Sequence, residues 1–368
     1  MKIVIALNTA WNLVNFRAGL IRALVAEGHD VVAVAPYDEY APRLAELGCR
    51  FVALPMDNKG THPGRDLLLF FRFLKLLRRE QPDVFLGYTV KPNVYGSLAA
   101  RVLDIPVVNN VAGLGAVFIR KNWLTRLVRQ LYKSAFSRSR HVFFQNNEDM
   151  QLFVVQRLVA ADKISRLPGS GVDLGAFSYS PIQSFENRKL HFLLVARLLW
   201  DKGIGEYVDA ARIVKRKYPA ATFQILGFLD AKNPTAVSKA EMTAWVDEGV
   251  VEYLGVADDV KPYLVAADCV VLPSYREGVP RSLLEAAAIG RPIVTTDAVG
   301  CRDVVDDGVN GLLCKVGDAE DLAEKLIRMI EVPHEDRMQM GLKGRRKMEC
   351  EFDEQLVIRS YFEVINGL

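Results

Sequence analysis

Residues 269–297 read CVVLPSYREGVPRSLLEAAAIGRPIVTTD and contain three local patterns in succession. Residues 269–274 are a short run of mostly apolar residues, which predicts a strand buried on both faces. Residues 281–290 are mostly apolar or small and predict a helix, and residues 292–297 predict a second strand. A strand, a helix and another strand in this order are typical of a βαβ unit with parallel strands. The stretch therefore predicts an α/β fold.

The same alternation of apolar runs and helical patterns extends along the whole chain. Nine further runs predict strands, at residues 3–7, 31–35, 51–55, 83–88, 106–111, 141–146, 190–196, 221–226 and 250–255. These runs are nearly all apolar instead of alternating with polar residues, which indicates parallel sheets covered by helices on both faces. Residues 166–189 interrupt the rhythm with Gly, Ser and Pro, so we predict a linker there.

The linker divides the chain into two predicted Rossmann-like domains, each with a doubly wound parallel sheet. A length of 368 residues also favours two domains over one. We expect residues 1–170 to form the first domain and 171–352 the second, with a C-terminal helix at 353–368 that packs back on the first. Because ligands of open parallel sheets bind beyond the carboxyl ends of the strands, we expect the two domains to face each other across a cleft.

Composition limits the class of protein further. Half of the residues are hydrophobic, so a large core is available. The five cysteines lack C-x-x-C spacing, which is typical of reduced thiols in a cytosolic protein. The first apolar run is too short for a signal peptide, and no apolar run approaches the roughly 18 residues of a membrane span.

Two glutamates flank the turn between the strand and the helix of the quoted stretch. Pro280 suits a first helical position, and Gly278 allows close backbone approach. The helix N-terminus would then offer N–H groups to an anion such as a diphosphate. Glu277 and Glu285 could each accept hydrogen bonds from a vicinal diol of a sugar. The alternatives are that Glu285 pairs with Arg281 on a helix surface, and that Glu277 is a solvated turn residue.

A second loop of the same half carries two cations. Arg197 and Lys202 flank the loop after the strand at 190–196, and Gly203 allows it to turn tightly into the next helix. Two cations beside a helix N-terminus can neutralise a diphosphate. The alternative is a solvated basic pair, bridged to Asp201.

These motifs resemble one enzyme family. VARLLWDKG at 195–203, the Glu-x7-Glu spacing of 277–285 and DGVNGLLCKVGDAEDLAEKL at 307–326 are similar to the retaining GT-B glycosyltransferases of glycosyltransferase family 4. The resemblance extends over the whole chain and is strongest between Val195 and Val316.

The resemblance implies a role for each residue of the two loops. Glu277 would lie beside the donor sugar, and Glu285 would bind the nucleotide ribose. Arg197 and Lys202 would hold the diphosphate, whose charge grows as it leaves, together with backbone groups around Gly278, Val279 and Pro280. The sequence contains no D-x-D motif, which agrees with a reaction that needs no metal or other cofactor.

One position departs from the family pattern. Many members carry His after a central strand of the N-terminal domain, where this chain has Ala112, so no His-based role is implied. A retaining transfer can proceed by attack on the face that the leaving group departs from, with the leaving phosphate oxygen taking the acceptor proton.

The first half resembles a subgroup that glycosylates polyprenyl-diphosphate-linked sugars. The similarity lies in NFR at 15–17, TVKPNVYGSLAA at 89–100 and VAGLGAVF at 111–118. The acceptor-binding residues that we predict are Asn12, Asn15, Arg17 and Lys91. Lys91 would contact the acceptor diphosphate, with an exposed loop lysine as the alternative.

Basic residues are concentrated in the first half. Residues 1–170 hold 23 Lys and Arg against 13 Asp and Glu, whereas the remainder holds 24 against 31, and no acid occurs between Asp104 and Glu148. A polyanionic partner is therefore expected, and a basic amphipathic helix suits an anionic membrane surface. The predicted membrane contacts are Trp123, Arg126, Arg129 and Lys133. The apolar stripe of this helix is also typical of a helix that faces a core.

We therefore expect a glycosyltransferase that moves a hexose or N-acetylhexosamine from a UDP-sugar to a polyprenyl-diphosphate-linked saccharide in bacterial glycan assembly. It would act as a peripheral protein on the cytoplasmic face of the inner membrane. A GT-B sugar-nucleotide epimerase would share the fold but would not need a basic surface. A dehydrogenase is disfavoured because no G-x-G-x-x-G lies between the first strand and helix. A non-enzymatic nucleic-acid-binding protein would explain the basic half, but it would not explain the predicted diphosphate-binding residues.

Overall fold

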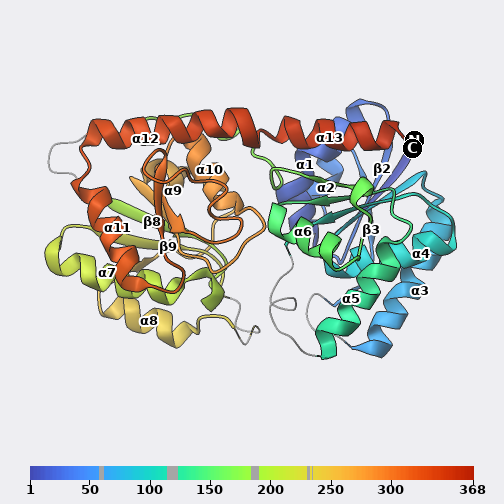
Figure 1. The fold of residues 1–368 in the computed structure, drawn as a ribbon, viewed down its shortest axis with the longest axis horizontal. Helices are drawn as coiled ribbons and strands as arrows, with labels where there is room; N and C mark the ends of the chain where they lie inside the picture. Colours follow the sequence, from blue (N-terminus) through green and yellow to red (C-terminus); the bar gives the residue numbers. More distant parts are fainter. Residues whose placement is uncertain (58–61, 114–122, 184–189, 230–232, 234) are drawn as a thin grey trace. The chain divides into compact units, whose positions relative to one another are not determined.

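The computed structural model describes residues 1–57, 62–113, 123–183, 190–229, 233 and 235–368. The described chain forms two compact units, residues 1–170 with 354–368 and residues 171–353 (Figure 1). Each unit holds one parallel sheet with helices on both faces. The prediction of two α/β units built on parallel sheets is therefore confirmed.

The first unit is built on a sheet of seven strands. Their order is β3-β2-β1-β4-β5-β6-β7, and all neighbouring strands are parallel. The strands are β1 (Lys2–Ala6), β2 (Asp30–Ala35), β3 (Arg50–Ala53), β4 (Val84–Tyr88), β5 (Val107–Val111), β6 (His141–Phe144) and β7 (Ile164–Arg166). The order reverses between β1 and β4, so the helices divide between the two faces of the sheet.

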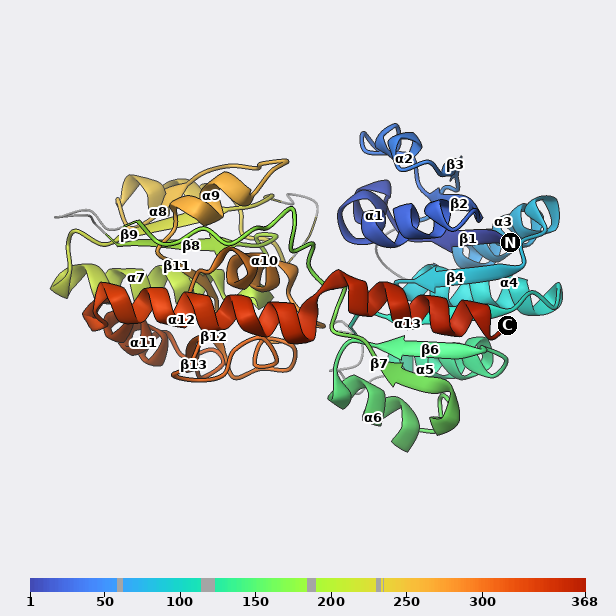
Figure 2. The ribbon, with the colours of Figure 1, turned by 90° about the horizontal axis from the view of Figure 1, so that it is seen from above.

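The helices of the first unit pack on both faces of this sheet. One face carries α3 and α4, with α5 and α6 beside them, and the opposite face carries α1, α2 and α13. Figure 2 shows α13 lying along the sheet on this second face. The helices are α1 (Ala10–Ala26), α2 (Arg43–Glu46), α3 (Pro63–Glu80), the π-helix η1 (Pro92–Gly96), α4 (Ser97–Val102), α5 (Trp123–Phe136), α6 (Asn147–Val155), η2 (Ala161–Lys163) and α13 (Glu354–Asn366).

The second unit is built on a sheet of six parallel strands in the order β10-β9-β8-β11-β12-β13. The strands are β8 (His191–Val195), β9 (Thr222–Leu226), β10 (Glu252–Tyr253), β11 (Cys269–Leu272), β12 (Ile293–Thr296) and β13 (Gly311–Cys314). The helices are η3 (Trp200–Lys202), α7 (Ile204–Lys217), α8 (Lys239–Asp247), α9 (Lys261–Ala266), α10 (Arg281–Ile289), α11 (Ala319–Glu331), α12 (His334–Lys347) and the π-helix η4 (Met348–Phe352). The strand order reverses between β8 and β11.

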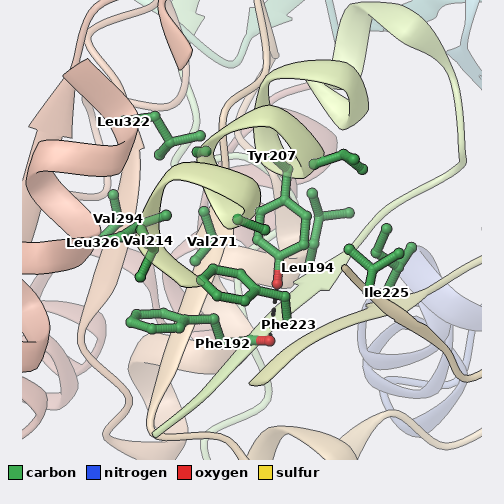
Figure 3. Packing of buried hydrophobic residues seen from close by; sticks show 14 of the residues in the cluster. Phe192, Leu194, Tyr207, Val214, Phe223, Ile225, Val271, Val294, Leu322 and Leu326 are labelled. Atoms are coloured by element: carbon green, nitrogen blue, oxygen red, sulfur yellow. Dashed lines mark hydrogen bonds between the residues drawn. The ribbon is translucent and has the colours of Figure 1, made fainter. Parts of the chain in front are cut away.

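The core of the second unit holds α7 firmly against the sheet. The Tyr207 ring packs against Phe223 between helix and strands, and the Tyr207 hydroxyl donates a hydrogen bond to the carbonyl of Phe192 at 2.9 Å (Figure 3). Tyr207 is fully buried, so this bond satisfies a polar atom that has no access to water. The N-terminus of α7, which follows the predicted cationic loop, is therefore anchored to β8.

Three strands differ from the sequence-based expectation. The run at 250–255 contributes only the two residues of β10, and Gly255, two residues beyond its end, has a φ of +77°. The edge strands β7 and β13 were not predicted, because Ile164–Arg166 contains one apolar residue and Gly311–Cys314 has only three after its glycine. Among the described residues, no helix combines the length and the apolar character needed to cross a bilayer.

Candidate active site

Two loops of the second unit meet at the point where its strand order reverses. The loop after β8 and the loop after β11 leave neighbouring parallel strands at their carboxyl ends. The backbone N–H of Tyr275 donates to the carbonyl of Asp201 at 2.9 Å, and Ser274 Oγ lies 3.2 Å from the same oxygen. In open parallel sheets this reversal point is where ligands bind.

The residues predicted to hold the diphosphate and the sugar contact each other directly. Lys202 Nζ forms an ion pair with Glu277 Oε1. The Lys202 and Glu277 side chains are only 12% and 16% exposed, so the pair is shielded from bulk water. Ser274 Oγ donates a second hydrogen bond to the same carboxylate oxygen at 2.8 Å. Glu277 is thus not a solvated turn residue, and Lys202 does not pair with Asp201.

Glu285 is held by Arg281 but is not on a helix surface. Arg281 Nε lies 2.6 Å from Glu285 Oε1, the pairing that was the alternative interpretation of this glutamate. Glu285 is nevertheless buried, with 9% of its surface exposed. Burial raises the pKa of the Glu285 carboxyl above its usual range, and the Arg281 guanidinium opposes that rise. One carboxylate oxygen can accept hydrogen bonds beyond the one from Arg281, so the pair does not exclude a ligand.

The turn before α10 differs from the prediction by one residue. Pro280 precedes the helix in an extended conformation, with φ −74° and ψ 116°, and α10 begins at Arg281. Gly278 and Val279 are half-buried in this turn. The N–H of Glu277 donates to the carbonyl of Val299 at 2.9 Å, which ties the turn to the loop after β12. The N-terminus of α10, which has no side-chain cap, therefore follows this turn at Arg281.

Arg197 lies on the same loop as Lys202 but in a different environment. Its side chain is exposed, two residues beyond the end of β8. Within the described part of the chain, no carboxylate forms an ion pair with it. Arg197 is thus a cation available to an anionic ligand, whereas Lys202 already has a carboxylate partner.

Two residues near Glu277 were missed from the sequence. Ser274 is fully buried and orients the Glu277 carboxylate. Gly300 has φ +82°, and a Cβ there would overlap the carbonyl oxygens of Glu277 and Gly278. A glycine shortly after a predicted strand is a weak sequence signal for a close backbone approach. The contact itself could not be predicted, because Gly300 and Glu277 lie on loops more than twenty residues apart.

The predicted acceptor residues of the first unit fall on helices. The structure begins α1 at Ala10, because the Thr9 side chain caps it by accepting from the N–H of Asn12. Asn12 and Asn15 are thus on a helix instead of a loop, and their amides donate to Asn8 Oδ1 at 2.7 Å and to the Trp11 carbonyl at 2.9 Å. Arg17, on the same helix, is buried.

Lys91 is not an exposed loop lysine. Its ammonium forms an ion pair with Asp66 Oδ1 of α3 at 2.9 Å, and both side chains are largely buried. An acceptor diphosphate would therefore compete with Asp66 for Lys91.

The basic helix α5 has a buried apolar face and exposed basic residues. Val128, Tyr132 and Ala135 are buried in the core, as expected for a helix on a sheet. Arg126 and Lys133 are exposed, whereas Arg129 is half-buried and its Nε is buried without a hydrogen-bond partner among the described residues. The side chain of Trp123 lies outside the described part of the structure.

Comparison with known proteins identifies the family. Residues 15–169 match the model of the glycosyl transferase 4-like domain, and residues 189–332 match that of the glycosyl transferases group 1. An N,N'-diacetylbacillosaminyl-diphospho-undecaprenol alpha-1,3-N-acetylgalactosaminyltransferase of Campylobacter jejuni is 30% identical over 99% of this chain and 98% of its own length. The chain belongs to glycosyltransferase family 4.

Other relatives of this glycosyltransferase agree with that assignment. A UDP-Gal:alpha-D-GlcNAc-diphosphoundecaprenol alpha-1,3-galactosyltransferase of Escherichia coli is 25% identical over 73% of the chain and 71% of its own length. The crystal structure of Anabaena Alr3699/HepE in complex with UDP has a TM-score of 0.80, covers 100% of both chains and is 19% identical. The predicted GT-B fold is thereby confirmed.

Replacing Gly203 of the glycosyltransferase with Ala should weaken nucleotide binding. Gly203 has φ +72°, and a Cβ there would overlap the carbonyl oxygen of Pro273, so the loop that carries Lys202 has to move. We expect UDP to bind at least about tenfold more weakly, since losing a hydrogen bond to a charged group costs about 1.5–3 kcal/mol. Calorimetric titration with UDP measures this.

The matched control is Gly249→Ala. Gly249 has a similar φ of +75°, but its added Cβ would meet no atom within 4 Å. This variant carries the same backbone strain without the collision, so it should bind UDP as the parent does. Equal UDP affinity in both variants would contradict a role for the Gly203 turn.

Proposed function

We propose that this glycosyltransferase moves a hexose or N-acetylhexosamine from a UDP-sugar, with retention of configuration, to a polyprenyl-diphosphate-linked saccharide. The observation that carries the proposal is the similarity over almost the whole chain to a transferase whose name specifies a diphospho-undecaprenol acceptor. A second relative, whose name specifies both a UDP-sugar and a diphosphoundecaprenol acceptor, supports it.

The site residues divide the chemistry between the two ends of the donor. Lys202 and Arg197 bind the diphosphate and stabilise the charge that develops on it as the glycosidic bond breaks. Glu277 accepts hydrogen bonds from the hydroxyls of the donor sugar, and Glu285 accepts them from the ribose. The Lys202–Glu277 contact supports this division. The diphosphate and the sugar of the donor are bonded to each other, so the cation that binds one and the carboxylate that binds the other should be neighbours, as they are.

The proposal is tested by a transfer assay. The protein is incubated with a panel of nucleotide sugars and a short-chain polyprenyl-diphosphate-linked saccharide, and the product is identified by mass and its anomeric configuration by NMR. We expect one UDP-sugar to be transferred with retention, and we expect EDTA to leave the rate unchanged. An inverted product, or release of an epimerised nucleotide sugar without transfer, would contradict the proposal.

We propose that the first unit of the glycosyltransferase binds the anionic surface of the membrane that carries the acceptor. On α5, Arg126 is exposed next to Leu127, which is 45% exposed, and Lys133 is exposed further along the helix. On α3 of the same face, Leu67 and Phe71 are 58% and 53% exposed. Exposed apolar side chains beside cations are typical of a surface that enters the headgroup region.

Reversing two charges of α5 should abolish liposome binding. Each cation contributes about 1 kcal/mol near an anionic surface, and Arg126→Glu with Lys133→Glu converts this attraction into repulsion. Sedimentation with anionic liposomes at low and high salt measures the effect, and turnover of a short-chain acceptor should be retained. We leave Arg129 unchanged because its Nε is buried.

A control separates local from global charge. Lys343→Glu with Arg346→Glu changes the net charge equally, at exposed positions of α12 in the second unit. Sedimentation should be retained in this variant. If both double variants lose liposome binding to the same extent, α5 is not the contact surface.

A further inference from the structure

A second polar cluster lies in the first unit, at the carboxyl ends of two neighbouring strands. Tyr88 is the last residue of β4 and lies opposite Asn110 of β5 in the parallel register. Arg17 of α1 places its guanidinium 4.4 Å from the centre of the Tyr88 ring. Tyr361 of α13 completes the cluster, with its hydroxyl accepting from Asn110 Nδ2 at 3.0 Å. The four residues are 0–4% exposed.

Three atoms of this cluster are buried without a hydrogen-bond partner in the described structure. They are Arg17 Nε, the Tyr88 hydroxyl and Asn110 Oδ1. The Tyr88 and Tyr361 rings lie side by side, with their centres 6.1 Å apart. An unpaired buried polar atom costs about 1–3 kcal/mol, so three in one place are not explained by packing alone. Arg17 also lacks a carboxylate partner among the described residues, although it is 4% exposed.

The backbone beside the cluster is strained. Thr89, directly after Tyr88, has φ +58°, a conformation that a β-branched residue rarely adopts. The next helical segment is the π-helix η1, another feature that is often found at functional sites. Strain of this kind persists where the surrounding structure imposes it, and it concentrates at ligand-binding sites. These observations do not depend on the unpaired atoms.

The unpaired atoms specify the chemistry of a ligand. The Arg17 N–H requires an acceptor, and its charge favours an anion such as a phosphoryl oxygen. Asn110 Oδ1 requires a donor, such as a hydroxyl or an amide N–H, and the Tyr88 hydroxyl can donate or accept. A glycosyl phosphate presents both kinds of group close together, because its phosphoryl group is attached to C1 of the sugar and a hydroxyl or acetamido group to the neighbouring C2. Inorganic phosphate alone lacks the sugar hydroxyl and amide N–H groups, so it cannot contact Arg17 and the Asn110 oxygen with two separate groups as a glycosyl phosphate can.

We propose that Arg17, Tyr88 and Asn110 form a subsite for the glycosyl phosphate of the acceptor, the sugar and phosphoryl group that join the saccharide to its lipid. The phosphoryl oxygen binds Arg17, and a hydroxyl or acetamido N–H of the sugar donates to Asn110. Tyr361 is a positioning residue that orients the Asn110 amide. This inference rests on the proposed acceptor, and it adds Tyr88, Asn110 and Tyr361 to the residues expected from the sequence.

The test uses Tyr88→Phe, which removes one unpaired hydroxyl and keeps the ring under Arg17. If the cluster only packs the unit together, this change leaves ligand binding unaltered and the melting temperature equal or higher. The proposal predicts an unchanged or higher melting temperature together with weaker binding of N-acetylglucosamine 1-phosphate, by about 10- to 100-fold, in calorimetric titrations at saturating UDP. Saturating UDP occupies the donor site, so the binding measured belongs to a separate subsite. The acceptor KM in the transfer assay should rise, and the donor KM should not.

Several controls make the outcome decisive. Inorganic phosphate and free N-acetylglucosamine should each bind the parent protein more weakly than the sugar phosphate. Tyr207→Phe removes a buried hydroxyl that does have a partner, so it should lower the melting temperature and leave sugar-phosphate affinity unchanged. Arg17→Lys keeps the charge but loses the Nε donor, and it should weaken binding as Tyr88→Phe does.

The subsite is overturned if the parent protein does not bind the sugar phosphate, if UDP abolishes that binding, or if Tyr88→Phe binds as the parent does. Unfolding of Tyr88→Phe would also overturn it, because the hydroxyl would then be structural. The proposed function can fail separately. Suppose that the parent protein binds the sugar phosphate through these residues but transfers no sugar to any polyprenyl-diphosphate acceptor. That result would support the subsite and contradict the proposed reaction.

Discussion

Lys202→Ala should lower kcat/KM for sugar transfer by about 10²–10³, the range for losing one group that stabilises transition-state charge. Arg197→Ala should have a loss of the same order. The two variants should differ in stability, because Arg197 is exposed without a described ion pair, whereas Lys202 neutralises the shielded Glu277 carboxylate. We expect the melting temperature of Arg197→Ala to match the parent and that of Lys202→Ala to fall. Steady-state kinetics with a thermal melt of each variant measure both effects.

A lysine remote from the loops provides the control. Lys343→Ala removes an exposed cation of α12, so both kinetics and melting should match the parent. Near-normal turnover in Lys202→Ala and Arg197→Ala would exclude the diphosphate assignment. A Lys202→Ala/Glu277→Gln double variant removes the unpaired charge, so it should recover stability without recovering transfer.

Alanine variants of Glu277 and Glu285 should lose different properties, the transfer rate in the first and UDP binding in the second. Glu285→Ala is expected to weaken binding of UDP alone by about 10- to 100-fold, because the ribose loses hydrogen bonds to a carboxylate. Glu277→Ala should leave UDP affinity nearly unchanged and lower the transfer rate by about 10²–10³. Calorimetry with UDP and single-turnover kinetics with the UDP-sugar separate the two steps.

The control for Glu285 must account for its ion pair with Arg281. Arg345 and Glu349 form a similar pair four residues apart on a helix of the same unit, with Nε to Oε1 at 2.7 Å. Glu349→Ala therefore removes a pair of the same spacing, at a glutamate whose side chain is 47% exposed, and should leave UDP affinity unchanged. Equal losses of UDP affinity in Glu277→Ala and Glu285→Ala would show that the two glutamates do not divide the donor between them.

The fold followed from local patterns along the chain. Buried parallel strands carry apolar runs, and these runs predicted all the strands except the short β7 and β13. The Glu-x7-Glu spacing and the Arg197–Lys202 loop could also be found in the sequence, because each motif is local to a single strand-to-helix connection. Their residue types alone suggest binding of a diphosphate and a diol. The family resemblance connected these two loops to one reaction.

Contacts between segments distant in the sequence were decided by tertiary structure alone. Lys202 and Glu277 are 75 residues apart, and only the adjacency of β8 and β11 brings them into an ion pair. Asn110 and Tyr361 are 251 residues apart, and they meet because α13 packs on the sheet of the first unit. The burial of Glu285 was also decided by tertiary structure: one interpretation of the sequence placed it on a helix surface beside Arg281, whereas the structure buries it, and burial raises the pKa of its carboxyl. The physical reason is that periodicity records which face of an element is buried, whereas pairing, shielding and unpaired atoms depend on which other elements cover that face.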